Sequence, residues 1–163
     1  MKKYRVSFDY VSYDSIDELT PEESSLLARA NTAREKAYSP YSGFNVGAAV
    51  LMGTGKVVVG SNQENASYPS GLCAERVAVF SAGANYPNQV IKMIAITAGA
   101  TGREVLKPAG PCGNCRQAIL EYEQKQQRPI VILLQGSAGP IYKCQSVADL
   151  LPLAFNSSFL SDS

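Results

Sequence analysis

Histidine is absent from the 163 residues of this chain. A Ser-His-Asp triad, a Cys-His nucleophilic pair and any zinc site that uses imidazole are therefore excluded. Proton transfer near neutral pH must come instead from a carboxylate with a raised pKa, a lysine, a cysteine or a tyrosine.

Strong net charge and long apolar runs are also missing. The formal net charge is +1 at pH 7, which argues against a nucleic-acid partner, although one local cation can still bind a phosphate. No apolar run reaches the roughly 18 residues that span a bilayer, so we expect no membrane partner. Residues 1–6 lack the apolar stretch of a signal peptide, and this indicates a cytoplasmic location, where thiols stay reduced.

The chain has four cysteines. In a reducing compartment, metal ligands, catalytic groups or core residues are a better interpretation of them than two disulfides. The chain length fits one ordinary domain. We assign residues 1–18 to an N-terminal arm, which suits an edge strand or a loose segment, and residues 19–163 to a single domain.

Helical and strand patterns alternate along this domain. Thr20-Pro21-Glu22-Glu23 is typical of a capped helix start, and apolar spacing extends that helix to about residue 38. Runs at 46–52 and 56–61 predict a hairpin, and 91–98, 130–134 and 141–144 predict further strands. Helices are expected at about 73–83 and 112–127, with a short one at 147–151. The predicted fold is a three-layer α/β/α domain around one mixed five-stranded sheet.

Three cysteines lie at the starts of the second and third helices. Cys112 and Cys115 are three residues apart, so their sulfurs face the same side of a first helical turn. A third thiolate from Cys73 would leave the fourth tetrahedral position for water, as in a catalytic zinc site. Taken alone, however, the Cys-x-x-Cys pair is also typical of a redox dithiol, and Cys73 of a buried core residue.

The combined pattern favours Zn²⁺ as the cofactor. Cys73-Ala74-Glu75 with Pro111-Cys112-Gly113-Asn114-Cys115 is the signature of zinc nucleobase deaminases, with cysteine in place of the usual histidine. Glu75 is expected to take a proton from the water that zinc activates and to deliver it to the substrate. Its alternative role is a solvated glutamate stabilised by the helix dipole.

The residues beside these ligands have expected supporting roles. Three thiolates and Zn²⁺ sum to one negative charge, which Arg76 or Arg116 could offset by hydrogen bonding a ligand sulfur. Cys144 lies in a strand-like run without a paired cysteine. We expect it to be a core or surface-strand residue and not a fourth ligand that would close a structural centre.

At these residues the chain resembles the small, homotetrameric cytidine deaminases, over about residues 19–155. The similarity is carried by Ser39-Pro40-Tyr41-Ser42, Phe44-Asn45-Val46-Gly47-Ala48-Ala49, Asn62-Gln63-Glu64-Asn65-Ala66-Ser67-Tyr68, Cys73-Ala74-Glu75-Arg76, Pro111-Cys112-Gly113-Asn114-Cys115-Arg116-Gln117 and Leu150-Leu151-Pro152 with Phe155. The N-terminal arm has no counterpart in the short members of the family.

The resemblance implies a set of substrate contacts. Asn62 and Glu64 would bind the ribose hydroxyls, which suits an amide and a carboxylate, although loop polarity alone would also explain them. Phe44 would stack on the pyrimidine ring, where its alternative is a core aromatic residue.

Two further contacts are implied by the same family. The backbone amide of Ala74 and the carboxylate of Glu75 would read the edge of the base. Phe155 would close the pocket of a neighbouring subunit in the homotetramer, although Asn156-Ser157 replaces the Gly-Pro that commonly follows in the family.

The implied function is hydrolysis of cytidine or 2′-deoxycytidine to uridine or deoxyuridine and ammonia, in pyrimidine salvage. A blasticidin-type aminonucleoside deaminase shares the cysteine motifs, but Asn62, Glu64 and Phe155 favour the pyrimidine nucleoside. A non-catalytic zinc module would instead have a closed ligand shell and an unimportant Glu75. No lysine or arginine pocket for a 5′-phosphate stands out, which favours free nucleosides over nucleotides.

Overall fold

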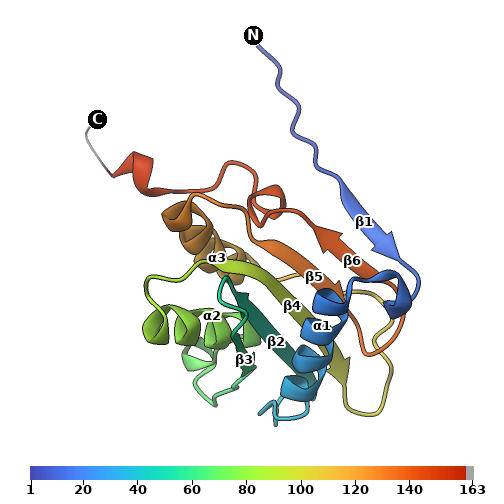
Figure 1. The fold of residues 1–163 in the computed structure, drawn as a ribbon. Coiled ribbons are helices and arrows are strands. Elements are labelled where there is room, and N and C mark those ends of the chain that lie inside the picture. The colour runs from blue at the N-terminus through green and yellow to red at the C-terminus, as the bar shows by residue number, and fades with distance from the viewer. Residues whose placement is uncertain (161–163) are drawn as a thin grey trace.

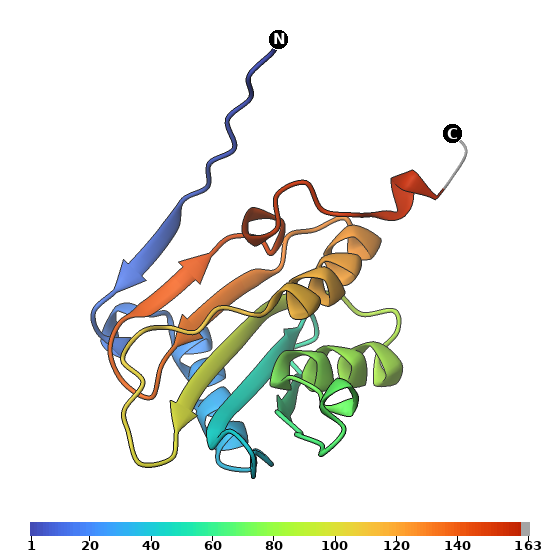
Figure 2. The same cartoon turned by 180° about the vertical axis from the view of Figure 1, so that it is seen from behind.

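The computed structural model describes residues 1–160, and in it helices cover both faces of one mixed sheet (Figures 1 and 2). The strands lie in the order β1-β6-β5-β4-β2-β3, with only β4 and β5 parallel. Their bounds are β1 Tyr10–Tyr13, β2 Phe44–Met52, β3 Val57–Ser61, β4 Ile91–Ala100, β5 Val131–Gln135 and β6 Ile141–Cys144. Residues 161–163 of the predicted domain lie outside the described residues.

The sheet has six strands, so the predicted five-stranded sheet is wrong by one. The additional strand is β1, which comes from the segment assigned to the arm and pairs antiparallel with β6. Pairing satisfies the otherwise open edge of β6, and the Tyr10 ring packs on Tyr142 with 4.8 Å between centroids. A four-residue alternation is too short to distinguish such a strand from a loose segment.

The predicted three layers are present. Helix α1 (Pro21–Arg34) packs on one face of the sheet, while α2 (Ala74–Asn85) and α3 (Gly113–Gln126) pack on the other. Each face has its own buried apolar cluster, because successive strand residues point to opposite sides. No helix in residues 1–160 is long and apolar enough to cross a membrane.

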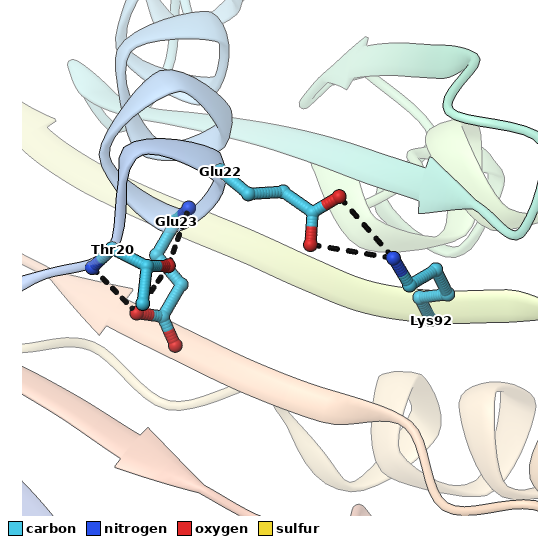
Figure 3. A network of polar contacts seen from close by, with 4 residues as sticks. All are labelled: Thr20, Glu22, Glu23 and Lys92. Carbon is cyan, nitrogen blue, oxygen red and sulfur yellow. Dashed lines mark hydrogen bonds and ion pairs between the residues drawn. The ribbon is translucent and has the colours of Figure 1, made fainter.

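The start of α1 is capped as its sequence predicts (Figure 3). The Thr20 backbone amide donates to Glu23 Oε2 at 2.9 Å, and the Glu23 amide donates to Thr20 Oγ1 at 3.3 Å. The helix ends at Arg34 and not near residue 38, because Tyr38 leaves it to bridge with Gln63. Outside the cap, Lys92 binds Glu22 at 3.2 Å.

The buried carboxylate of Glu123 connects α3 to the segment after β6. It accepts hydrogen bonds from the Ile130 and Val147 amides at 2.7 and 3.1 Å, from the Ala148 amide at 3.3 Å, and from the Ser146 hydroxyl. These bonds hold the start of the 3-10 turn Ala148–Leu150, which replaces the predicted short helix at 147–151.

Glu123→Ala is expected to lower the free energy of unfolding by at least about 3 kcal/mol, because the buried amides of Ile130 and Val147 both lose their acceptor. Urea unfolding followed by circular dichroism measures the loss. Glu121→Ala on the exposed side of the same helix is the matched control and should change stability little. Equal effects of the two substitutions would contradict the assigned role.

Candidate active site

The starts of α2 and α3 lie next to each other and carry the three cysteines. Cys73 and Cys112 are the N-cap residues of α2 and α3, and Cys115 lies buried in the first turn of α3. Gly60 on β3 allows α2 to lie this close to the sheet, since a Cβ there would come within 2.7 Å of the Ala74 carbonyl oxygen. The local fold thus brings sulfurs from two distant segments together.

The spacing of the sulfurs fits zinc. Cys73 Sγ lies 3.8 Å from Cys112 Sγ, and Cys112 Sγ lies 3.6 Å from Cys115 Sγ. Tetrahedral zinc with bonds of about 2.3 Å separates two thiolate ligands by about 3.8 Å. The fourth cysteine, Cys144, is buried in the core cluster beneath α2 and α3 and does not belong to this group. Three ligands leave a fourth coordination position open.

The groups around the sulfurs favour the thiolate form of Cys73, which is the form that binds a metal. A hydrogen bond from Cys115 lowers the pKa of the Cys73 thiol to about 5, with further contributions from Cys112 and Arg76. The same hydrogen bond raises the pKa of Cys115. Burial opposes the charge of Arg76, but its contacts with Cys73 and Cys115 outweigh burial and raise the pKa of its guanidinium. Arg76 therefore offsets negative charge at the cluster.

Glu75 is buried beside the sulfurs, with 4% of its surface exposed. Burial raises the pKa of its carboxyl, and the negative charge of Cys73 raises it further. Its Oε2 atom has no hydrogen-bond partner within residues 1–160. A buried carboxylate with a free oxygen and a raised pKa is suited to accepting and releasing protons near neutral pH.

A cavity of about 510 Å³ opens in front of two of the cysteines. This volume is within the range of small-molecule sites, about 300–1,000 Å³. Its lining includes Tyr41, Ser42, Asn62, Gln63, Glu64, Asn65, Tyr68, Leu72, Cys73, Arg76, Cys112 and Asn114. The predicted residues Asn62 and Glu64 thus share one cavity with the metal cluster. Phe44, Ala74 and Glu75 are not part of its lining.

Glu64 is held in place by the loop across the cavity. Its carboxylate accepts hydrogen bonds from the Tyr41 amide at 2.9 Å and from the Ser42 hydroxyl at 2.5 Å. The Ser42 hydroxyl contributes most to lowering the pKa of Glu64, and the Tyr41 amide lowers it further. Ser42 also accepts from the Phe44 amide at 3.0 Å. In the sequence, Ser42 stands out only as part of the Ser39-Pro40-Tyr41-Ser42 motif shared with the cytidine deaminases, and its contact with Glu64 was not predicted.

The side-chain amide of Asn62 hydrogen bonds the backbone of strand β2. Its Nδ2 donates to the Phe44 carbonyl oxygen at 2.9 Å, and its Oδ1 accepts from the Val46 amide at 2.8 Å. One N–H and one lone pair remain free for a ligand. Asn62 therefore fixes the backbone from the Phe44 carbonyl to the Val46 amide while it faces the cavity.

Arg116 and Phe155 are not part of the lining of this cavity. Arg116 donates from Nε to Pro111 O and from Nη1 to Leu150 O, both at 2.7 Å, so it braces the loop before Cys112. Phe155 is 56% exposed and stacks on Phe159, with 5.4 Å between ring centroids. Its carbonyl oxygen accepts from Gln117 on α3 at 2.9 Å.

Sulfurs at zinc spacing, one open ligand position and an adjacent buried carboxylate are the features by which zinc hydrolases activate water. Here these features lie at two helix starts on one face of a mixed sheet. Within the zinc hydrolases, this arrangement points to the zinc-dependent deaminases.

Comparison with known proteins agrees with this class. The family model described as the cytidine and deoxycytidylate deaminase zinc-binding region matches residues 20–131. A cytidine deaminase of Halalkalibacterium halodurans is 41% identical over 137 residues, which are 84% of this chain and 96% of the relative. One from Sporosarcina psychrophila is 39% identical over 136 residues, covering 83% and 93% of the two chains.

A solved structure shows the same relationship. The crystal structure of cytidine deaminase from Burkholderia pseudomallei is 40% identical, with a TM-score of 0.71, and the match covers 84% of this chain and all of that one. The chain belongs to the cytidine and deoxycytidylate deaminase family, and it is a zinc-dependent hydrolase.

Proposed function

We propose that this chain hydrolyses cytidine and 2′-deoxycytidine to the corresponding uridines and ammonia, and that Cys73, Cys112 and Cys115 hold its zinc. The observation that carries the proposal is the partnerless buried carboxylate oxygen of Glu75 beside three sulfurs at zinc spacing. The relatives named cytidine deaminase support the substrate. Zinc bound there supplies a Lewis acid that lowers the pKa of a water molecule toward neutrality.

Glu75 moves the protons in this mechanism. It accepts a proton from the attacking water and passes it to ring nitrogen N3 as the water oxygen adds to C4. It then takes the second proton from the new C4 hydroxyl group and gives it to the amine, so that the C4–N bond breaks, the C4 carbonyl forms and ammonia leaves. Its raised pKa suits both the uptake and the release of a proton. The Ala74 amide and the Glu75 carboxylate together read the edge of the base.

Positioning the nucleoside falls to residues on the other side of the cavity. Glu64 and the free N–H of Asn62 bind the ribose hydroxyls, and Phe44 stacks on the ring. Asn62 and Ser42 support this arrangement, because both hydrogen bond the Phe44 backbone. Arg76 offsets the negative charge of the thiolates, and Arg116 hydrogen bonds the loop that precedes Cys112.

Metal analysis combined with an ammonia-release assay tests the proposed function. We expect about one zinc per chain, with turnover of cytidine and deoxycytidine and little of adenosine or dCMP. Zinc without ammonia release would indicate a structural zinc module. Turnover of blasticidin S in place of cytidine would indicate an antibiotic deaminase.

Glu64→Ala is expected to raise the KM for cytidine by roughly 10- to 100-fold, with a smaller change in kcat, because a charged hydrogen-bond acceptor for the ribose is lost. Steady-state kinetics with cytidine and 2′,3′-dideoxycytidine measures the effect. The dideoxy substrate lacks both hydroxyls, so the substitution should change its KM little. Gln63→Ala in the same cavity lining is the control, and an equal loss with both substrates would contradict the assignment.

We further propose that the enzyme is a cytoplasmic homotetramer in which Phe155 reaches the active site of a neighbouring subunit. The exposed ring of Phe155, held in place through its carbonyl by Gln117, supports this role. Three ligand thiols are also compatible with a reducing compartment, where they stay free to bind metal.

A further inference from the structure

Residues 1–9 extend beyond the body of the molecule (Figures 1 and 2). They continue β1 away from the sheet, and within residues 1–160 no hydrogen bond or ring contact joins them to the remainder of the chain. Apolar side chains alternate along this segment, and Tyr4, Val6 and Phe8 are 83%, 66% and 44% exposed. An extended segment with an open apolar face is unstable on its own in water.

Strand β1 has a free edge on which a strand from another chain could pair, next to residues 1–9. It pairs with β6 on one side only, and the ladder ends at the pair of Tyr10 and Cys144. Tyr4, Val6 and Phe8 continue the alternation of Tyr10, so all four lie on one face of the extended strand. The backbone groups of residues 1–9 remain open to pairing with another chain.

We propose that residues 1–9 pair with the N-terminal segment of a second copy of this chain (residues 1–13), as an antiparallel ribbon around a two-fold axis. With Val6 opposite Val6, Tyr4 faces Phe8 and Lys3 faces Asp9. With the axis at Ser7 instead, Val6 faces Phe8 and Arg5 faces Asp9. In both registers apolar residues meet on one face and opposite charges meet on the other.

The intermediate register is excluded by the same pattern. An axis between Val6 and Ser7 would pair even with odd positions and set apolar side chains opposite polar ones. The complementarity of Asp9 with Lys3 or Arg5 also favours a second copy over a negatively charged surface, which Asp9 would repel. This inference does not depend on the proposed catalytic function.

Cysteine cross-linking tests the pairing in the full, zinc-loaded chain. A residue at the two-fold axis faces itself at about 4.5–5.5 Å between Cα atoms, within the range of a disulfide. We therefore expect either Val6→Cys or Ser7→Cys to form a covalent dimer under mild oxidation at least roughly ten-fold faster than Ser25→Cys, an exposed control on α1. Non-reducing electrophoresis and intact mass measure it. Equal rates for all three variants would overturn the proposal.

Charge reversal distinguishes pairing from random collision. Asp9→Lys in the cross-linking variant should slow dimer formation roughly ten-fold, because each opposite-charge pair becomes a like-charge pair. Adding Lys3→Asp and Arg5→Asp should restore the rate. Failure of this restoration would overturn the proposed register of charges.

Removal of residues 2–9 provides a second measurement. The shortened chain should keep its zinc and its unfolding temperature, while its self-association, measured by sedimentation, weakens by at least roughly ten-fold. Unchanged self-association would overturn the proposal. Binding of the full chain, but not of the shortened one, to vesicles of phosphatidylglycerol and phosphatidylcholine would assign residues 1–9 to a lipid surface instead.

Discussion

Glu75→Gln is expected to keep the zinc and the fold and to lose roughly 100- to 10,000-fold in kcat, the usual contribution of a general acid–base residue. Glutamine has the same shape as glutamate, so the packing around this buried side chain is preserved. Its amide cannot accept a proton from water at neutral pH. Both the attack on C4 and the protonation of the leaving amine then lose their catalyst.

Zinc content, thermal unfolding and ammonia release, measured on the same preparation, separate catalysis from folding. Glu121→Gln, on the exposed side of α3, is the control for the chemical change and should retain full activity. Near-normal turnover by Glu75→Gln with normal zinc content would exclude Glu75 as the proton carrier.

Cys115→Ser is expected to empty the metal site and to reduce activity by more than about 100-fold, since even the groups that support a ligand contribute about 10- to 100-fold. A hydroxyl binds zinc far less readily than a thiolate does. Because Cys115 is completely buried, the unused hydroxyl also lowers stability. Metal analysis after dialysis, together with ammonia release, measures both losses.

Cys144→Ala is the matched control, because Cys144 is also buried but lies in the core cluster beneath α2 and α3. It should retain about one zinc per chain and nearly normal turnover, with a modest loss of stability. Loss of zinc from Cys144→Ala with retention in Cys115→Ser would reverse the assignment of ligands.

The metal cluster could be predicted because its signal is local. Cys112 and Cys115 share one helical turn, and Cys73 and Cys112 each occupy a helix N-cap, so short segments of sequence specify where the sulfurs point. The capping box of α1 is equally local and was predicted for the same reason.

Features that depend on distant pairing were harder to predict. Strand β1 exists because β6 offers an edge, and α1 ends early because Tyr38 bridges Gln63. The sequence left Arg76 and Arg116 as equal candidates for the charge beside the sulfurs. The structure directs Arg76 to the sulfurs and Arg116 to two backbone carbonyls, a difference set by tertiary packing.

The two helices that supply the sulfurs also set the order in which the metal site can be completed during folding. Cys112 and Cys115 come together as soon as one helical turn forms. Cys73, however, lies 39 residues before Cys112, and strand β4 comes between the two cysteines in the sequence. The third ligand arrives only when β4 is inserted between β2 and β5 and both helices have docked on the same face. A nascent or partly folded chain therefore presents a two-sulfur half-site, and tight retention of zinc is a property of the finished tertiary structure.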